Sequence, residues 1–169
     1  DLEVLALGTL HDFPDRKPLV ETLRMIDNSG AIPVVPWAAG KWLGKRGIVL
    51  QRLIEDPGDL FFTLCDNGNR PYFWPWPRHF KKAERNGISI VAGSDPLHFA
   101  SEVDRSGRFG FMVEAGVNPR TPSSDMVRLL RDKTKTIRRY GKLETCGRFV
   151  RNQMFMQLGK NKWRKALVK

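Results

Sequence analysis

The sequence predicts an α/β fold built as a (βα) barrel or as part of one, and two observations lead to this prediction. Short apolar runs rich in β-branched residues alternate with segments of helical hydrophobic spacing over residues 1–122. Such alternation favours a parallel sheet with right-handed crossovers. The phosphate-binding patterns GxGxxG and GxxxxGKS/T do not occur in the chain, so a barrel is favoured over a nucleotide-binding sheet.

The predicted strands and helices follow one another in order along this part of the chain. We expect strands at residues 2–8, 31–35, 60–65, 88–92 and 109–113, each a short apolar run bounded by turn residues. Helices are expected at residues 18–29, 48–55 and 78–86, and Gly30 and Gly87 supply the stop signals of the first and third. Parallel strands would place their carboxyl ends at one edge of the sheet.

Residues 123–169 are expected to form a basic extension of two helices that packs on the barrel part. Ser123 to Asp125 offers a helix N-cap, and a helical apolar repeat runs from Met126 to Ile137. A second helix is predicted at residues 146–158, after Gly141.

Positive charge is concentrated in this extension. The formal net charge is +11, and residues 126–169 contain 14 Lys and Arg against 2 Asp and Glu, whereas residues 1–125 are nearly neutral. One interpretation is that these side chains cover the exposed faces of the two helices. The other is that they bind nucleic acid or another polyanion, whose phosphates Lys and Arg neutralise.

No apolar run in the sequence approaches the roughly 20 residues of a membrane-spanning helix, and no secretory leader pattern is present. Cys65 and Cys146 have neither metal-knuckle spacing nor a disulfide framework around them. We therefore expect a cytoplasmic protein with no membrane partner. The chain starts at Asp1, directly before a predicted strand, so we also expect it to be a fragment whose fold includes a missing N-terminal part.

Polar residues follow several of the predicted strands and would meet at their shared edge. Carboxylates and imidazoles hold divalent cations such as Zn²⁺, Mn²⁺ or Mg²⁺, and the candidate ligands are Asp95, His98, His11 and Asp12. Other polar groups near these strand ends could bind a small phosphorylated substrate, and these are Asp66, Asn67, Lys41, Lys45 and Arg105.

Several of these residues also have a structural interpretation. Asp95 precedes Pro96, and this pair would make a good N-cap and first position for a helix. The run from Asp66 to Asn69 is typical of a turn, and so is the segment that starts at His11.

The segments LEVLALG, VVPW, LCDNGN, VAGSDPLHF and GRFG occur in an order that resembles the PHP superfamily, the polymerase and histidinol phosphatase group of metal-dependent phosphoesterases. The resemblance covers residues 1–113, and its most specific part is Gly93-Ser94-Asp95, which is similar to the family's Gly-Ser-Asp-x-His strand end. It implies a distorted (βα) barrel, of which this chain would be the C-terminal half. It also implies metal ligands at the strand ends and hydrolysis of a phosphoester.

The sequence departs from the family pattern at most ligand positions. Leu97 stands where the family has a ligand His, and Val35 replaces the His of a His-Pro strand end. Glu3 lies in the strand that often carries another His, so only Asp95 carries over as a ligand. One function that fits is a PHP-like hydrolase whose incomplete metal site is completed by the missing N-terminal half. If strands are missing, open sheet edges would need covering, so we also expect association with a second copy or with another chain. The alternative is an inactive barrel that acts as a binding or scaffold module, with the basic extension contacting nucleic acid.

Overall fold

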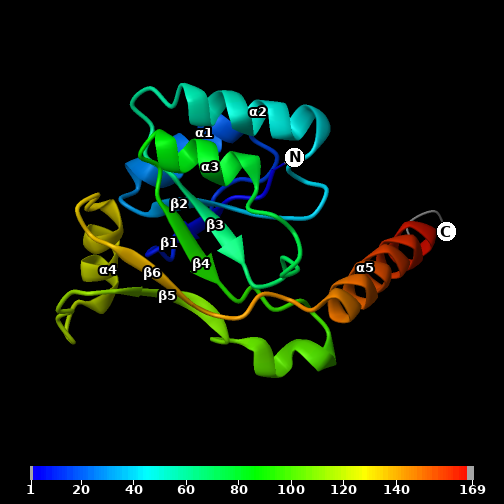
Figure 1. Cartoon of the computed structure of the whole chain (residues 1–169). Coiled ribbons are helices and arrows are strands. Elements are labelled where there is room, and N and C mark those ends of the chain that lie inside the picture. The colour runs from blue at the N-terminus through cyan, green and yellow to red at the C-terminus, as the bar shows by residue number, and fades with distance from the viewer. Residues whose placement is uncertain (1, 167–169) are drawn as a thin grey trace.

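The computed structural model describes residues 2–166, and the side chains of residues 2–158. Strands and helices alternate in the order β1 (Leu5–Leu7), α1 (Leu19–Asn28), β2 (Ile32–Pro36), α2 (Gly44–Glu55), β3 (Thr63–Asn67), α3 (Arg78–Arg85) and β4 (Ile90–Gly93) (Figure 1). They are followed by the 3₁₀ helix η1 (Ala100–Arg105), β5 (Phe109–Val113), α4 (Pro122–Arg131), β6 (Ile137–Gly141) and α5 (Cys146–Ala166). The α/β class that the sequence predicts is confirmed.

The main sheet has the strand order β1-β2-β3-β4, and β2, β3 and β4 run parallel as predicted. The prediction of a parallel first strand is wrong, because β1 is antiparallel to β2 and Leu7 faces Ile32. The cause is the connection between these strands. The loop from Gly8 to Pro18 and the helix α1 together return the chain to the end of the sheet at which β1 finished, so the next strand starts beside the end of β1.

A second, antiparallel sheet consists of β5 and β6, in which Val113 faces Ile137. The prediction that β5 extends a parallel sheet is therefore wrong, and so is the prediction of a helix that continues to Ile137. The helix α4 ends at Arg131, and Asp132 then accepts hydrogen bonds from the backbone N–H and the hydroxyl of Thr134, at 3.0 and 2.6 Å. This turn stops the helix, and the β-branched residues after it favour a strand.

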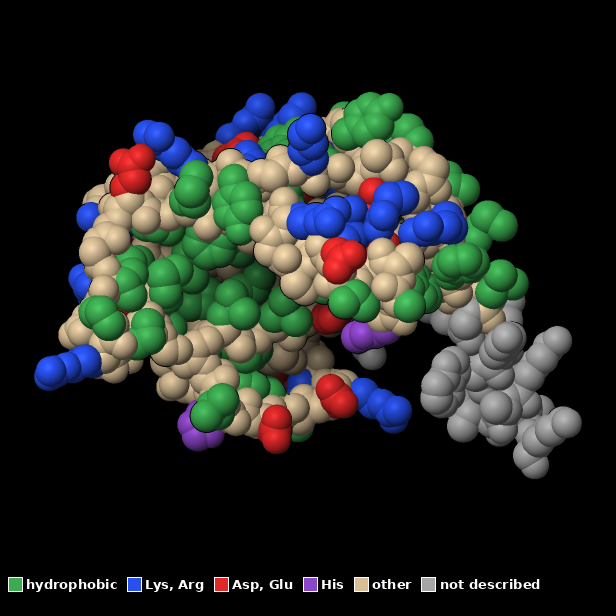
Figure 2. Space-filling view, turned by 90° about the horizontal axis from the view of Figure 1, so that it is seen from below, with side chains coloured by type: hydrophobic (Ala, Val, Ile, Leu, Met, Phe, Trp, Pro, Cys, Tyr) green, Lys and Arg blue, Asp and Glu red, His purple; other side chains and the backbone are tan. Residues whose placement is uncertain are grey.

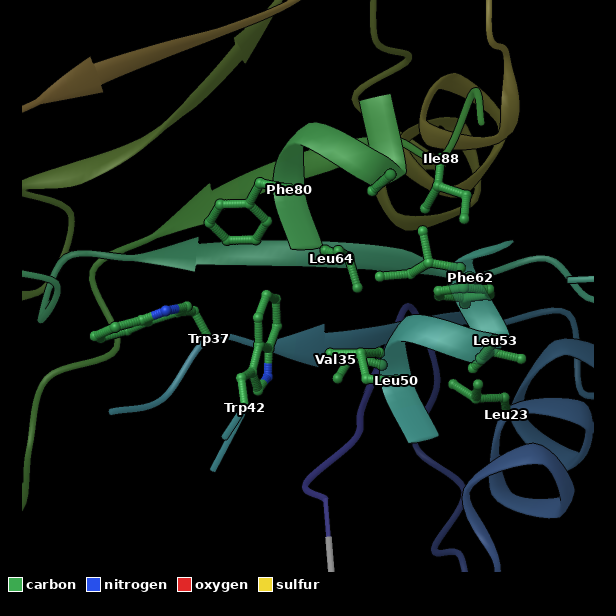
Figure 3. Close-up of a cluster of buried hydrophobic side chains, with 12 residues drawn as sticks. Leu23, Val35, Trp37, Trp42, Leu50, Leu53, Phe62, Leu64, Phe80 and Ile88 are labelled. Atoms are coloured by element: carbon green, nitrogen blue, oxygen red, sulfur yellow. The ribbon is translucent and has the colours of Figure 1, made fainter. Parts of the chain in front are cut away.

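Helices α1, α2 and α3 cover one face of the main sheet (Figure 1). The larger apolar cluster lies between these helices and the sheet, and Leu23, Leu50 and Phe80 each contribute a fully buried side chain to it (Figure 3). The ring of Trp42 meets the ring of Phe80 edge to face, with 5.1 Å between their centroids. Burying one side chain of this size contributes about 1.5–3 kcal/mol. This layer therefore holds the parallel strands, and the loops at their ends, in place.

The opposite face of the main sheet is only partly covered. Val34 and Cys65 are buried there beneath Leu130 of α4, but Leu5 and Leu7 of β1 keep 38% and 37% of their surface exposed. Figure 2 looks onto this side and shows an apolar hollow. A cavity of about 410 Å³ lies here between β1, β2, β5 and α4. In the part of the chain that the structure describes, the main sheet is open and does not close into a barrel.

The last helix, α5, starts at Cys146, where the sequence predicts a helix, and extends away from the rest of the fold (Figure 1). Phe149 near its start packs against Trp74, with 6.3 Å between the ring centroids. Within residues 2–166, neither α5 nor another helix has the length and apolar character needed to cross a membrane.

Candidate functional site

The carboxyl ends of β2, β3 and β4 lie together at one edge of the main sheet, because these strands are parallel. Asn67 at the end of β3 faces Gly93 at the end of β4. Beyond these ends the loops stay in contact, since Trp37 N donates to Cys65 O and Gly68 N donates to Gly93 O, each at 2.8 Å. Ligands of parallel α/β sheets bind at this edge, so we take it as the candidate site.

Asp95 is the central residue of the candidate site, and it has an unusual backbone conformation. Its φ is 41°, in the left-handed region, which few non-glycine residues other than Asn and Asp adopt. Asn67 Nδ2 donates to Asp95 Oδ2 at 2.8 Å, and Asn69 Nδ2 donates to the Asp95 carbonyl at 2.5 Å. Asp95 does not cap a helix that starts at Pro96, because the next helical segment is η1, with Phe99 at its N-cap.

Asn67 contacts Asp95 from a buried position at the end of β3. Only 4% of its surface is exposed, and its Nδ2 also donates to the Trp37 carbonyl at 2.6 Å. Its Oδ1 is buried without a hydrogen-bond partner. Such acceptors are rare in folded proteins and costly to leave unpaired. This oxygen belongs to the amide group whose nitrogen contacts the Asp95 carboxylate, and it is therefore a candidate ligand atom.

Charges of both signs surround Asp95. Desolvation raises the pKa of Asp95 although the residue is exposed on one side, and the Glu3 carboxylate raises this pKa further. The hydrogen bond from Asn67 and the charges of Lys41 and His98 lower it. Lys41 Nζ is itself bound to Glu3 Oε2 at 2.7 Å. The structure therefore brings four residues that the sequence predicts to this edge, together with Glu3, which the sequence analysis did not place in the site.

The direction of β1 decides which of its flanking residues reach this edge. Glu3 precedes β1 and lies at the edge where β2 ends, whereas His11 and Asp12 follow β1, which ends beside the start of β2. Both are exposed and line a groove of about 640 Å³ between β1 and the loop that follows it. The structure therefore does not bring His11 and Asp12 to the strand ends that carry Asp95.

Asp66 lies on the other side of β3 from Asn67, since successive side chains of a strand alternate. There it accepts hydrogen bonds from Arg70 Nε and Nη2, both at 2.8 Å. Arg139 approaches Asp66 to 3.6 Å and stacks on Trp76, with 4.1 Å between its guanidinium carbon and the ring centroid. Asp66 is 1% exposed. The structure thus places Asp66 in a buried ion pair, closed to a substrate.

The two remaining candidates for substrate binding lie apart from Asp95. Lys45 is exposed in the first turn of α2. Arg105 is 12% exposed and pairs with Glu102 and Glu144, at 3.2 and 3.1 Å. Its Nη2 also donates to the Gly68 carbonyl at 3.3 Å, so Arg105 supports the loop beside the candidate site.

The oxygen atoms at this edge fit a hard divalent cation in part. The Asp95 carboxylate and the unpartnered Asn67 Oδ1 are ligands of the kind that Mg²⁺ and Mn²⁺ prefer, whereas Zn²⁺ favours imidazole and thiolate. Within the described residues, no group of three or more His, Cys, Asp or Glu side chains gathers to hold a metal ion. The chain therefore offers an incomplete set of ligands.

The arginines of the basic extension are paired within the molecule. Every arginine between residues 126 and 158 lies at ion-pairing distance from a carboxylate, and the pairs are Arg128–Asp125, Arg131–Asp27, Arg138–Glu114, Arg139–Asp66, Arg148–Glu102 and Arg151–Glu102. All of these carboxylates belong to residues 1–125. Each of these arginines is therefore engaged in an ion pair within the chain, and two of the carboxylates are shared, since Asp66 also pairs with Arg70 and Glu102 also pairs with Arg105.

Comparison of the chain with protein-family models, with curated proteins and with solved structures found no match.

Proposed function

We propose that this chain is part of a PHP-like, metal-dependent hydrolase that acts on a phosphoester, with its metal site at the carboxyl edge of β2, β3 and β4. The observation that carries the proposal is the arrangement of Asn67 and Asp95. Asn67 Nδ2 donates to the carboxylate of Asp95, which has a left-handed backbone conformation, while the buried Asn67 Oδ1 has no hydrogen-bond partner. Backbone strain and an unpaired acceptor both cost stability, and such costs concentrate where a functional site needs a fixed geometry. The resemblance of Gly93-Ser94-Asp95 to the family's strand end supports the same assignment.

The residues at this edge would have the following roles. Asp95 and Asn67 would hold a divalent cation, and His98 would add a nitrogen ligand. A cation bound there supplies a water of lowered pKa and a Lewis acid for the phosphoryl oxygen. Lys41, whose charge already acts on Asp95, would bind a phosphate oxygen, and Glu3 keeps the Lys41 ammonium in position through their 2.7 Å ion pair.

We also propose that further strands cover the open face and complete a PHP-type barrel. Helices α1, α2 and α3 lie on one face of the sheet, as the helices outside a (βα) barrel do. On the other face, Leu5 and Leu7 keep 38% and 37% of their surface exposed, and Leu7 lines the apolar cavity beneath α4. Apolar surface of this kind usually becomes covered, and a second copy or another chain segment would supply both the cover and the missing ligands.

The affinity of the purified chain for Mn²⁺, followed by the electron paramagnetic resonance signal of the free ion, tests the proposed metal site. Asp95→Asn removes the carboxylate charge, keeps the shape of the side chain and tolerates the left-handed conformation. Asp12→Asn removes the same charge from the exposed loop after β1 and serves as the matched control.

We expect the wild type and Asp12→Asn to bind Mn²⁺ equally, and Asp95→Asn to bind at least about tenfold more weakly, because a carboxylate ligand is lost. Hydrolysis of bis(p-nitrophenyl) phosphate should follow the same order. A wild type that does not bind Mn²⁺, or an Asp95→Asn variant that binds it as well as the wild type, would overturn the proposal.

The ion pairs of the basic extension favour this proposal over a module that binds polyanions. Guanidinium groups that already contact Glu102 or Asp66 are less available to neutralise the phosphates of a nucleic acid. Among the side chains that the structure describes in the extension, the exposed cations also include Lys133, Lys135 and Lys142.

A further inference from the structure

Two buried glutamates join three parts of the chain next to the candidate site. Glu102 in η1 is fully buried, and Glu144, between β6 and α5, is 1% exposed. Arg105 bridges them, with Nε 3.2 Å from Glu102 Oε2 and Nη2 3.1 Å from Glu144 Oε2. Arg148 in the first turn of α5 also contacts both, at 2.7 Å from Glu102 and 3.5 Å from Glu144. These four residues are called the glutamate–arginine quartet below.

The quartet is a costly way to stabilise a fold. Desolvation of buried carboxylates offsets much of their attraction to the arginines, and apolar residues of similar shape are often as stabilising. Several polar atoms of the quartet also lack a well-aligned hydrogen bond, including Oε2 of both Glu102 and Glu144. A buried ionic network does fix the relative positions of the segments that it joins. The quartet is therefore better explained by the geometry that it imposes than by the stability that it adds.

The segment that the quartet holds is the loop after β3. Glu144 N donates to Arg70 O, and Tyr72 N donates to Glu144 O, both at 2.9 Å. From another direction, Arg105 Nη2 donates to Gly68 O at 3.3 Å. The loop from Gly68 to Tyr72 is therefore attached to the quartet at both of its ends.

This same loop positions Asp95. Asn67 and Asn69, at its start, donate the two hydrogen bonds that hold the Asp95 side chain and carbonyl. Gly68 lies between them, and its carbonyl is the atom that Arg105 binds. A continuous set of hydrogen bonds and ion pairs thus connects the quartet with Asp95.

We propose that Glu144, Arg105 and Arg148 are positioning residues of the candidate site, which set the conformation of residues 67–72 and thereby the orientation of Asp95 toward a bound cation. The part of this proposal that concerns the cation rests on the proposed function, whereas the part that concerns the loop does not. The proposal also gives the basic extension a role inside the molecule, because Arg148 belongs to α5.

Two variants and a matched control test this role. Arg105→Lys keeps the positive charge, but an ammonium cannot contact two carboxylates and a carbonyl in the geometry of a guanidinium. Glu144→Gln keeps the backbone hydrogen bonds of residue 144 and removes its charge. Arg151→Gln is the control, because Arg151 pairs with Glu102 at 3.6 Å and its polar contacts lie outside the loop.

The measurements are made by NMR and by Mn²⁺ titration on the same samples. The side-chain amide signals of Asn67 and Asn69 report their hydrogen bonds to Asp95. Hydrogen exchange at the Tyr72 amide reports the attachment of the loop, and exchange at Leu64 in the core gives the baseline. A residue that only stabilises the fold would change Tyr72 and Leu64 together.

We expect both quartet variants to shift the side-chain amide signals of Asn67 and Asn69 and to weaken Mn²⁺ binding. Hydrogen exchange at the Tyr72 amide should become at least about tenfold faster relative to exchange at Leu64. The Arg151→Gln control should leave all three quantities unchanged. Unshifted asparagine signals in both variants would overturn the positioning role, and so would equal acceleration of loop and core. If the loop signals move although the wild type does not bind Mn²⁺, the positioning of the loop is supported and the proposed function fails.

Discussion

Replacing Asp66 by Asn would show whether its ion pair with Arg70 is a structural element of the fold. Arg70 Nε and Nη2 each donate to Asp66 at 2.8 Å, and neither residue is more than 4% exposed. The variant keeps the shape of the side chain but leaves the Arg70 guanidinium without its carboxylate. Arg139, 3.6 Å from Asp66, loses its counter-charge as well. The variant therefore leaves the buried Arg70 guanidinium without an anionic partner, whereas Arg139 is exposed to solvent.

The expected loss of stability is large for a single substitution. Removing one partner of a buried ion pair costs about 3–5 kcal/mol, whereas an exposed pair contributes about 1 kcal/mol or less. The whole free energy of unfolding of a domain is about 5–15 kcal/mol. Since 1 kcal/mol shifts Tm by about 2–4 °C at this chain length, Asp66→Asn should lower Tm by roughly 6–20 °C.

Urea unfolding followed by circular dichroism measures this loss. Glu21→Gln is the matched control, because Glu21 pairs with Lys17 at the same distance of 2.8 Å but on the surface, and it should cost about 1 kcal/mol or less. The double variant Asp66→Leu, Arg70→Met removes both charges and should recover most of the lost stability. If Asp66→Asn costs no more than Glu21→Gln, the argument from burial is refuted.

Two further predictions concern titratable groups. Cys146 is exposed and should react quickly with a disulfide reagent at pH 8, whereas Cys65 should react only on unfolding, because burial raises the pKa of its thiol to about 12. The absorbance of the released thiolate measures both rates, and equal rates in the folded protein would contradict this prediction. Desolvation raises the pKa of Asp95, which means that the folded state favours the protonated carboxyl group. The resulting stabilisation of the fold is present at acid pH and is lost as the pH rises through the folded-state pKa. Asp95→Asn should therefore stabilise the fold at pH 7, by less than about 1 kcal/mol because the group is partly solvated, and not at pH 3. Urea midpoints at the two pH values check this, and equal gains at both would exclude a charge effect.

The parallel strands and their helices could be predicted because each depends on local sequence. Gly30 and Gly87 follow α1 and α3 with φ of 83° and 66°, a conformation that glycine adopts at no steric cost, and both glycines predict the ends of these helices. The bounds of β3 were less accurate. The strand was expected at residues 60–65 and spans Thr63–Asn67, so Asp66 and Asn67 belong to the strand itself.

The direction of β1 and the pairing of β5 could not be predicted in the same way. Strand direction depends on the course of the loop from Gly8 to Pro18, which no local pattern fixes. β5 pairs with β6, and the chain between them contains a helix, so the pair is not a hairpin with a recognisable turn.

The candidate site could be predicted in part. Asp95 and Asn67 can be predicted as site residues because they stand at the ends of predicted strands. Because side chains alternate along a strand, Asp66 lies on the same side of β3 as Leu64, toward the helices. Nothing in the sequence around Glu102 predicts that its side chain is buried and paired with arginines. It is one of several acidic residues in a polar stretch, and Arg148, its partner at 2.7 Å, lies 46 residues further along the chain.

The distribution of charge along the chain is explained only when the parts before and after residue 122 are considered together. Without Arg148, the buried Glu102 would lose its shortest ion pair, and without Arg139, Asp66 would lose its second cation. β6 also pairs with β5 across the same point in the sequence. These contacts join β6 to Asp66 of the main sheet and the first turn of α5 to η1. A cluster of positive charge in a sequence therefore indicates an anionic partner only where the carboxylates of the same chain leave that charge unpaired.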